Sequence, residues 1–238
     1  MANHGLKIKL YSDGADLKSM LEMAKLPHIT GLTTNPSLMK KAGVTDYTPF
    51  CKEVLSHIKD KPISFEVFAD DFAEMKRQGL LINSWGPNVY VKIPVMNSKG
   101  ENTYKLIQEL SHQNVKLNVT ALFTLEQVHH VVEALKGGAP SIISIFCGRI
   151  ADTGVDPQPM ARATVAMAAA GGKQMEVLWA STRELINLYQ AQECGCHIIT
   201  VPPDILKKLD MVGTDLHAMS LDTVKTFKKD SDQVGYKL

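Results

Sequence analysis

Short runs of apolar and β-branched residues recur along the chain at intervals of about 20 to 30 residues. The segments between these runs have helical spacing, as Leu17, Leu21 and Ala24 illustrate. Parallel strands need crossover connections and are buried on both faces, so this alternation predicts a parallel sheet covered by helices. The eight strand candidates are residues 7–13, 31–36, 63–69, 89–95, 116–123, 141–150, 176–181 and 197–202.

Eight strand-helix units in 238 residues favour an α/β fold of one closed (β/α)8 barrel, the TIM barrel. A doubly wound open sheet would show the same alternation, but it usually carries a glycine-rich nucleotide-binding turn after its first strand. The first turn here reads Asp-Gly-Ala-Asp at residues 13–16 and matches no such motif. Because no low-complexity linker interrupts the chain, we expect a single domain over residues 1–238, with an extra C-terminal helix from about residue 214.

Composition narrows the classes of function. Hydrophobic residues make up 45% of the chain and charged residues 21%, with a formal net charge of +1, which is ordinary for a folded protein and does not indicate a nucleic-acid-binding surface. No apolar stretch approaches the roughly 18 residues of a membrane span, and residues 1–9 contain no run of signal-peptide length. We therefore expect a cytoplasmic protein with neither a nucleic-acid nor a membrane partner.

The cysteine and histidine spacing does not favour a metal site. The four cysteines form no CxxC pair, and we expect them to be reduced and mostly buried. His129 and His130 are adjacent and point to different sides of a helix, and Glu133 completes no metal-ligand spacing with them.

Polar residues stand in the predicted strands, where a buried strand should be apolar. In a barrel of this kind the C-terminal ends of the strands carry the chemistry, so these residues are candidates for an active site. Taken strand by strand along the chain, they are Asp13, Asn35, Glu66, Lys92, Asn118 with Thr120, Ser144 with Arg149, and Ser181 with Arg183.

Lys92 is the most informative of these residues. The strand VYVKIPV at residues 89–95 would bury its ammonium group, and desolvation makes the charged form costly, which favours a neutral, nucleophilic amine. Glu66 and Asp13 on neighbouring strands could serve the proton transfers that imine chemistry needs. Two structural alternatives stay open: Lys92 could pair with a carboxylate, Glu66 included, or extend out of the barrel.

Arg149, Ser181 and Arg183 form a second group, with two guanidinium groups and one hydroxyl at the ends of the sixth and seventh strand candidates. Such a set suits a phosphate dianion, and TIM barrels often bind phosphate near their late loops. Arg183 alone could instead be a solvent-exposed residue at the start of a helix.

Five segments of the sequence together resemble the transaldolase family in its short form. The similarity runs from Asp13 to about Leu209, in the same order and spacing. The segments are GLTTNPS at 31–37, VKIP at 91–94, NVTALF at 118–123, SIFCGRI at 144–150 and ASTR at 180–183.

The resemblance implies a role for each candidate residue. Lys92 would form the Schiff base, Asp13 would act as acid and base on the hydroxyl that loses its proton as the carbon–carbon bond breaks, and Glu66 and Thr120 would hold the catalytic water. Asn35, Asn118 and Ser144 would bind the sugar hydroxyls, and Arg149, Ser181 and Arg183 would bind the phosphate. No cofactor is needed, because the iminium is the electron sink. The implied substrate-binding residues are Thr33, Asn35, Asn118, Phe123, Ser144, Arg149, Ser181 and Arg183.

Fructose-6-phosphate aldolases belong to the same short group but release free dihydroxyacetone. They resemble one another in carrying Gln and Tyr where this chain has Glu66 and Phe123, and a phenol can donate a proton that Phe cannot. The sequence therefore favours a transaldolase. Met96, where the family more often has Thr, and a longer loop at 97–100 depart from the family pattern and can alter the rim of the pocket.

The expected reaction transfers dihydroxyacetone from sedoheptulose 7-phosphate or fructose 6-phosphate to glyceraldehyde 3-phosphate or erythrose 4-phosphate, as in the pentose phosphate pathway. The aldolase is the alternative enzyme, and an inactive barrel that binds sugar phosphates or a partner protein is a third possibility. Short members of the family assemble into rings, often through the C-terminal helix, so the resemblance also implies a homo-oligomer.

Overall fold

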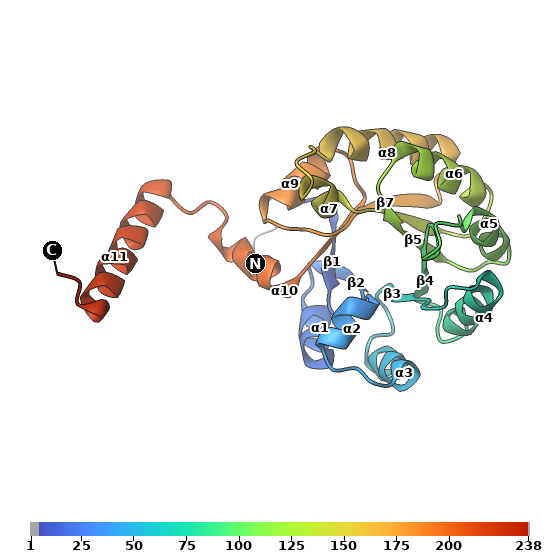
Figure 1. Ribbon diagram of the computed structural model, residues 1–238, viewed down its shortest axis with the longest axis horizontal. Coiled ribbons are helices and arrows are strands. Elements are labelled where there is room, and N and C mark those ends of the chain that lie inside the picture. Colours follow the sequence, from blue (N-terminus) through green and yellow to red (C-terminus); the bar gives the residue numbers. More distant parts are fainter. Residues whose placement is uncertain (1–4, 238) are drawn as a thin grey trace.

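The computed structural model describes residues 5–237 and contains a closed barrel of parallel strands in the order β1 to β8 (Figure 1). All eight predicted strands are present, so the predicted fold class is confirmed. The strands are β1 (Lys9–Asp13), β2 (Ile29–Thr33), β3 (Ile63–Glu66), β4 (Val89–Pro94), β5 (Leu117–Leu122), β6 (Ser141–Ile145), β7 (Met175–Trp179) and β8 (Ile198–Val201).

Helices follow every strand and surround the barrel (Figure 1). They are α1 (Leu17–Lys25), α2 (Pro36–Lys41), α3 (Tyr47–His57), α4 (Phe72–Asn83), α5 (Tyr104–His112), α6 (Leu125–Leu135), α7 (Cys147–Ala151), α8 (Gln158–Gly171), α9 (Ile186–Glu193), α10 (Pro203–Leu206) and the 3-10 helix η1 (Lys207–Met211). A last helix, α11 (Leu216–Val234), follows them in the chain.

Four candidate residues lie outside the strands predicted for them. Phe123 and Ser181 come after the ends of β5 and β7, and Asn35 and Arg149 belong to helices. The second strand ends at Thr33, and Asn35 is the N-cap of α2, where its side chain accepts a hydrogen bond from the Leu38 backbone N–H. An Asn followed by proline at the first helical position favours this helix start. The sixth strand ends at Ile145, so Arg149 lies in α7 rather than in the strand.

Alternation along the strands separates two apolar clusters. Outward side chains such as Leu32, Val91 and Trp179 pack against the helices in the main core. A smaller cluster inside the barrel contains Tyr11 and Leu178 and is joined by partly buried aromatic rings. Since residues two apart share a face of a strand, Lys92 between the buried Val91 and Ile93 points inward. The outward core therefore stabilises the barrel while its interior is free to hold polar side chains.

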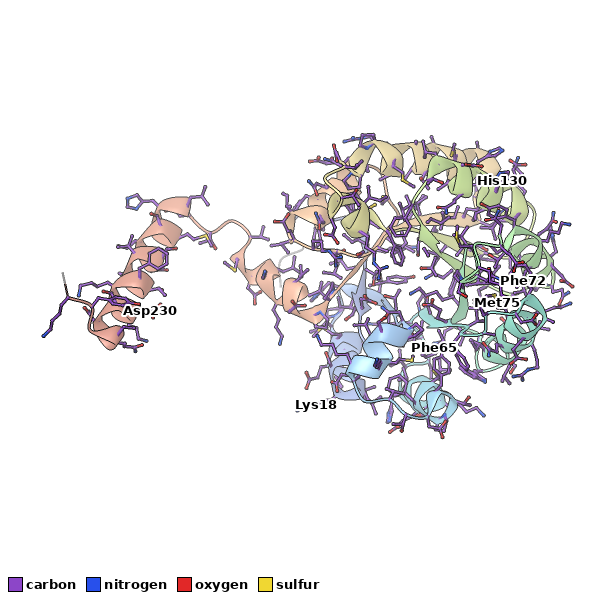
Figure 2. The ribbon with its side chains drawn as sticks, viewed as in Figure 1. Lys18, Phe65, Phe72, Met75, His130 and Asp230 are labelled. Atoms are coloured by element: carbon purple, nitrogen blue, oxygen red, sulfur yellow. The ribbon has the colours of Figure 1, made fainter. Side chains whose placement is uncertain are left out.

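Helix α11 extends away from the barrel and carries no buried residue (Figure 1). Figure 2 shows its side chains, Asp230 among them, on a segment set apart from the barrel. Asp215 caps its first turn by accepting a hydrogen bond from the Ala218 N–H, and Gly235 ends it in the left-handed conformation. The helix begins two residues later than the predicted position near 214. Within residues 5–237, no helix combines the length and apolar character that crossing a membrane requires.

Candidate active site

A cavity of about 270 Å³ opens at the C-terminal ends of the strands. It is lined by side chains from the strands and from the loops and helices that follow them, which is where catalytic residues of this fold lie. Glu66 and Phe123 are not among the lining residues. The predicted site residues that line it are Asp13, Thr33, Asn35, Lys92, Asn118, Thr120, Ser144, Arg149, Ser181 and Arg183.

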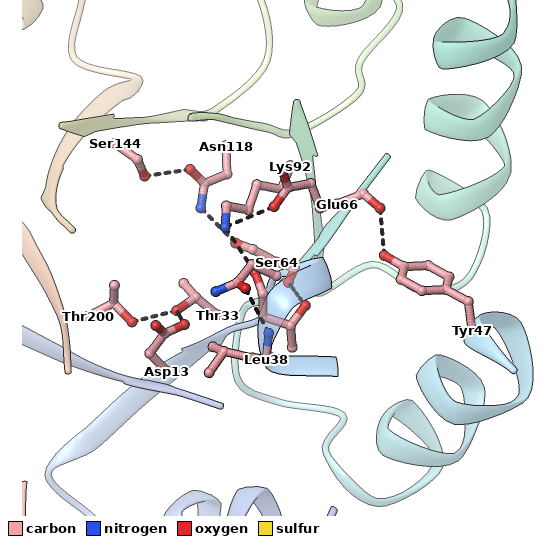
Figure 3. Close-up of polar contacts among 12 residues, drawn as sticks. Asp13, Thr33, Leu38, Tyr47, Ser64, Glu66, Lys92, Asn118, Ser144 and Thr200 are labelled. Carbon is pink, nitrogen blue, oxygen red and sulfur yellow. Dashed lines mark hydrogen bonds and ion pairs between the residues drawn. The ribbon is translucent and has the colours of Figure 1, made fainter. Parts of the chain in front are cut away.

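Lys92 is buried, with 7% of its surface exposed, and its amine reaches the cavity from β4. Its Nζ donates a hydrogen bond to the Thr34 carbonyl oxygen at 2.9 Å and lies 3.1 Å from Glu66 Oε2 (Figure 3). The side chain does not extend out of the barrel, and the Glu66 ion pair considered as an alternative is present. This pairing also places a proton acceptor directly on the amine.

Asp13 shares the cavity with Lys92 and is held by a neighbouring hydroxyl. Thr33 Oγ1 donates a hydrogen bond to Asp13 Oδ1 at 2.7 Å. Desolvation raises the pKa of the Asp13 carboxyl above its usual range, while the charge of Lys92 and the Thr33 hydrogen bond act in the opposite direction. A carboxyl with a raised pKa can both accept and return a proton nearer to neutral pH.

A chain of neutral polar groups lies beside the amine. Ser144 Oγ donates to Asn118 Oδ1 at 2.6 Å, and Asn118 Nδ2 donates to Ser64 Oγ at 2.9 Å (Figure 3). These bonds orient the Asn118 amide across β3, β5 and β6. Thr120 also lines the cavity, and its buried hydroxyl has no hydrogen-bond partner. A buried, unpartnered hydroxyl on a residue that lines a cavity is suited to bind a water molecule or a substrate hydroxyl.

The two arginines come from separate segments. Arg149 extends from α7 with its guanidinium 5.3 Å from the centre of the Phe146 ring. Arg183 follows Ser181 after β7 has ended at Trp179, and its Nε and Nη2 contact the Asp152 carboxylate at 3.1 and 2.5 Å. Arg183 is therefore paired with a carboxylate and not simply solvated. The cavity mouth presents two cationic groups to an anionic ligand.

Phe123 lies at the rim, beyond the end of β5. Its side chain is 38% exposed, and its ring lies 5.5 Å from that of Phe146, which does line the cavity. A residue at this place meets a ligand only near the opening. Phe123 was predicted to bind substrate, which suggests a position inside the cavity. The structure instead places it outside the cavity lining.

Several polar residues around the site were not predicted, Ser37 and Thr182 of the cavity lining among them. Thr200 on β8 contacts Thr33 Oγ1 with its own hydroxyl, Ser64 accepts from Asn118, and Tyr47 donates to the Glu66 carbonyl oxygen at 2.6 Å (Figure 3). Thr200 and Ser64 carry the same signal as the predicted residues, a polar side chain in an apolar run. Tyr47 begins a helix and has no signal of this kind.

Among residues 5–237, no three His, Cys, Asp or Glu side chains are grouped so that they could hold a metal ion. The four cysteines are free and buried, as predicted from their spacing. Burial raises the pKa of the Cys51 and Cys196 thiols to about 12, so neither is activated as a nucleophile.

A closed (β/α)8 barrel with an interior amine, two acidic groups and an arginine pair at its mouth defines a barrel enzyme with a candidate lysine nucleophile. The family described as transaldolase/fructose-6-phosphate aldolase matches residues 10–238. The chain belongs to this family and is an enzyme of the transaldolase type.

Relatives and a solved structure agree with this assignment at different levels. A probable transaldolase of Methanococcus maripaludis is 36% identical over 85% of this chain and 89% of its own length. One of Streptococcus agalactiae serotype V is 32% identical over 97% of this chain and its whole length. A crystal structure from Burkholderia cenocepacia J2315 has a TM-score of 0.59, covers 96% of this chain and 84% of its own, and at 11% identity shows the fold alone.

Proposed function

We propose that this enzyme transfers a dihydroxyacetone unit between sugar phosphates through a Schiff base on Lys92. The observation that carries the proposal is the buried Lys92 amine, 3.1 Å from Glu66 Oε2 and in the same cavity as Asp13. Family membership and the relatives named probable transaldolase support the same reaction. The donors would be sedoheptulose 7-phosphate or fructose 6-phosphate, as in the pentose phosphate pathway, and the expected setting is the cytoplasm.

The first half of the proposed reaction forms and cleaves the imine. Lys92 passes a proton to Glu66 and attacks the ketone carbon, and loss of water from the carbinolamine gives an iminium. Asp13 then removes the proton of the hydroxyl beyond the breaking carbon–carbon bond. The electrons of that bond move to the iminium nitrogen, an aldose phosphate leaves, and a three-carbon enamine stays on Lys92.

The second half returns the enamine to an aldehyde. The enamine carbon attacks glyceraldehyde 3-phosphate or erythrose 4-phosphate, Asp13 returns its proton to the new alkoxide, and water hydrolyses the iminium. Thr120, whose hydroxyl has no hydrogen-bond partner, and Glu66, which pairs with the Lys92 amine, would hold that water. Asn35, Asn118 and Ser144 would bind the hydroxyls of the three-carbon unit. The reaction would need no cofactor, because the iminium itself is the electron sink.

The segments that follow β6 and β7 would bind the phosphate group of the substrate. Arg149, Ser181 and Arg183 line one side of the cavity and supply two guanidinium groups and a hydroxyl. Guanidinium groups match the geometry of phosphate oxygens. This arrangement supports phosphorylated donors and acceptors over neutral sugars.

Borohydride trapping tests the Schiff base. With fructose 6-phosphate, reduction should leave an adduct on Lys92 that peptide mass spectrometry locates. Lys92→Met should abolish the adduct, while Lys18→Met on the exposed side of α1 should leave it unchanged. An adduct that persists at full yield in Lys92→Met would exclude the mechanism.

One assay distinguishes a transaldolase from an aldolase, because only the aldolase releases most of its dihydroxyacetone free. We propose that free dihydroxyacetone is a minor product in the presence of an aldose phosphate acceptor, because Phe123 offers no phenolic proton at the rim. Phe123→Tyr should increase release of free dihydroxyacetone from fructose 6-phosphate. Predominant release by the unmodified enzyme, even with acceptor present, would favour the aldolase.

We further propose that the enzyme is a homo-oligomer joined through α11. No residue of helix α11 is buried, although the helix carries large apolar side chains. Leu216, Val224 and Phe227 are 79%, 59% and 68% exposed. Large apolar side chains on a helix with no partner mark an interaction surface. A second copy of the chain is the partner that the family resemblance supports.

A further inference from the structure

Three neighbouring strands place a row of oxygen-bearing side chains at one side of the cavity. β8 and β2 flank β1 in the barrel, and their Thr200 and Thr33 lie beside Asp13 (Figure 3). Thr200 and Thr33 are buried, 5% and 3% exposed, and both line the cavity. Thr200 has no part in the reaction proposed above.

The direction of the hydrogen bonds along this row follows from proton counting. The Thr33 hydroxyl donates its single hydrogen to Asp13 Oδ1 at 2.7 Å. With Asp13 ionised, its oxygens can only accept, so the contact between Thr33 Oγ1 and Thr200 Oγ1 uses the hydrogen of Thr200. Thr200 donates to Thr33, and Thr33 donates to Asp13. The second oxygen of Asp13 is left for the substrate.

Thr200 is itself fixed from the phosphate side of the cavity. The buried Thr182 hydroxyl donates to the Thr200 backbone carbonyl oxygen at 2.8 Å. Thr182 lies between Ser181 and Arg183, in the loop proposed to bind phosphate. The end of β8 is thereby tied to that loop on one side and to Asp13 on the other.

We infer that Thr200 is a positioning residue that acts on Asp13 through the Thr33 hydroxyl, orienting one carboxylate oxygen and supporting its ionised form. The inference rests on the proposed function, because it assigns Thr200 an effect on the acid-base step. Its chemical basis is that a hydroxyl that accepts a hydrogen bond becomes a stronger donor, so the first bond of the chain strengthens the second.

The direction of the expected pH effect can be worked out from the groups that face Asp13. Lys92 on β4 favours the Asp13 carboxylate, Glu66 on β3 disfavours it, and the Thr33 hydrogen bond favours it. Weakening the Thr33 bond raises the pKa of Asp13 further. A step that needs the carboxylate then loses activity at a higher pH, so the acidic limb of kcat/KM moves upward.

The test compares Thr200→Val, which removes the hydroxyl, with Thr200→Ser, which keeps it. Thr200→Val should move the acidic limb upward by roughly 0.3 to 1 pH unit, and Thr200→Ser should leave it in place. Thr33→Val should move the limb further in the same direction. Adding Thr200→Val to Thr33→Val should have no additional effect, because the chain runs through Thr33. Thr164→Val on α8 controls for loss of a buried threonine hydroxyl.

Borohydride adducts locate the affected step. In Thr200→Val, adducts of the intact ketose phosphate should increase relative to three-carbon adducts, because the imine forms normally and bond cleavage slows. An unchanged limb and adduct ratio would overturn the inference while leaving the proposed function standing. Equal losses in Thr200→Val and Thr200→Ser without a limb shift would also overturn it, since that pattern indicates packing. No adduct in the unmodified enzyme would overturn the proposed function and the inference together.

Discussion

At the scale of single residues, the site holds acidic and basic groups where desolvation acts against their charged forms. Lys92 is nearly enclosed, and desolvation raises the pKa of Asp13. Each charged group is offset by specific neighbours, Glu66 and the Thr34 carbonyl for Lys92 and the Thr33 hydroxyl for Asp13. Such arrangements favour reactivity over stability, and the two properties should separate on mutation.

Asp13→Asn should separate catalysis from imine formation. Losing the acid-base group should lower kcat by about 10²- to 10⁴-fold, while the amine can still form an iminium. Mass spectrometry after borohydride reduction should therefore find the intact ketose phosphate on Lys92 and few three-carbon adducts. A normal yield of three-carbon adducts would show that another group takes the proton.

The same substitution should stabilise the folded protein near neutral pH. The unfolded carboxyl ionises at its usual pKa and the folded one only at higher pH, so stability is lost as pH rises between these two values. Asn cannot ionise and avoids that loss. Thermal melting should place the midpoint of Asp13→Asn above that of the unmodified enzyme at pH 7, with the gap closing below the usual pKa of an aspartate. A gap that widens with acidification would contradict this sign.

Arg183 is oriented by a carboxylate outside the cavity lining. Asp152 contacts Arg183 Nε and Nη2, and the pKa of Asp152 is lowered chiefly by this hydrogen bonding. Asp152→Asn should raise the KM for fructose 6-phosphate by about two- to fivefold, the scale of an exposed ion pair. The KM for unphosphorylated fructose should not change. Asp156→Asn in the same loop is the control, and equal effects on both sugars would argue against a phosphate role.

At the scale of elements, the short helix α7 packs directly on the loop after β7. A Cβ added to Gly148 would lie 1.5 Å from the Ser181 carbonyl oxygen, so only glycine permits this approach. Ser181 itself has a φ of 64°, a left-handed conformation that costs a non-glycine residue energy and recurs at functional sites. The contact fixes Arg149 relative to Ser181 and Arg183.

Gly148→Ala should therefore impair phosphate binding and stability together. The added methyl forces α7 away from the loop, with an overpacking cost of about 1–3 kcal/mol. Denaturant unfolding should show that loss, and the KM for ketose phosphates should rise. Gly79→Ala on α4 is the control, since its new methyl would lie 3.3 Å from the flexible end of Leu110. Full activity and stability in Gly148→Ala would mean that α7 can move freely.

At the scale of the whole molecule, the buried core belongs to the barrel and its surrounding helices, and α11 contributes no residue to it. Helix α11 has no buried residue and stands apart from the barrel (Figure 1). Truncation after Gly213 should leave barrel circular dichroism and melting of the isolated subunit nearly unchanged but reduce the mass measured by light scattering. Phe227→Glu should weaken assembly, and Thr226→Glu on the same helix should do so less. Equal mass for full-length and truncated chains would exclude assembly through α11.

Local pattern was sufficient for the strands and for most candidate residues, and its errors have a physical cause. Lys92 and Asn118 stood out because each stands between two apolar residues of a buried strand. Asn35 and Arg149 were assigned to strands although they begin or occupy helices, because a polar residue after an apolar run fits both descriptions. The Asn-Pro pair at 35–36 was the available signal for a helix start.

The sequence by itself determined the alternation of strands and helices, because that alternation depends on spacing along each segment. It also determined the family, because five segments stand in the family's order. The inward direction of Lys92 was decided by the closed barrel. Only the tertiary structure decided which side chains touch. Thr33 and Thr200 lie 167 residues apart, and Lys92 lies 58 residues from the carbonyl oxygen that it bonds. Closing the barrel places β2 and β8 on either side of β1, so that Thr33 and Thr200 meet inside it, and no periodicity within a strand predicts that contact.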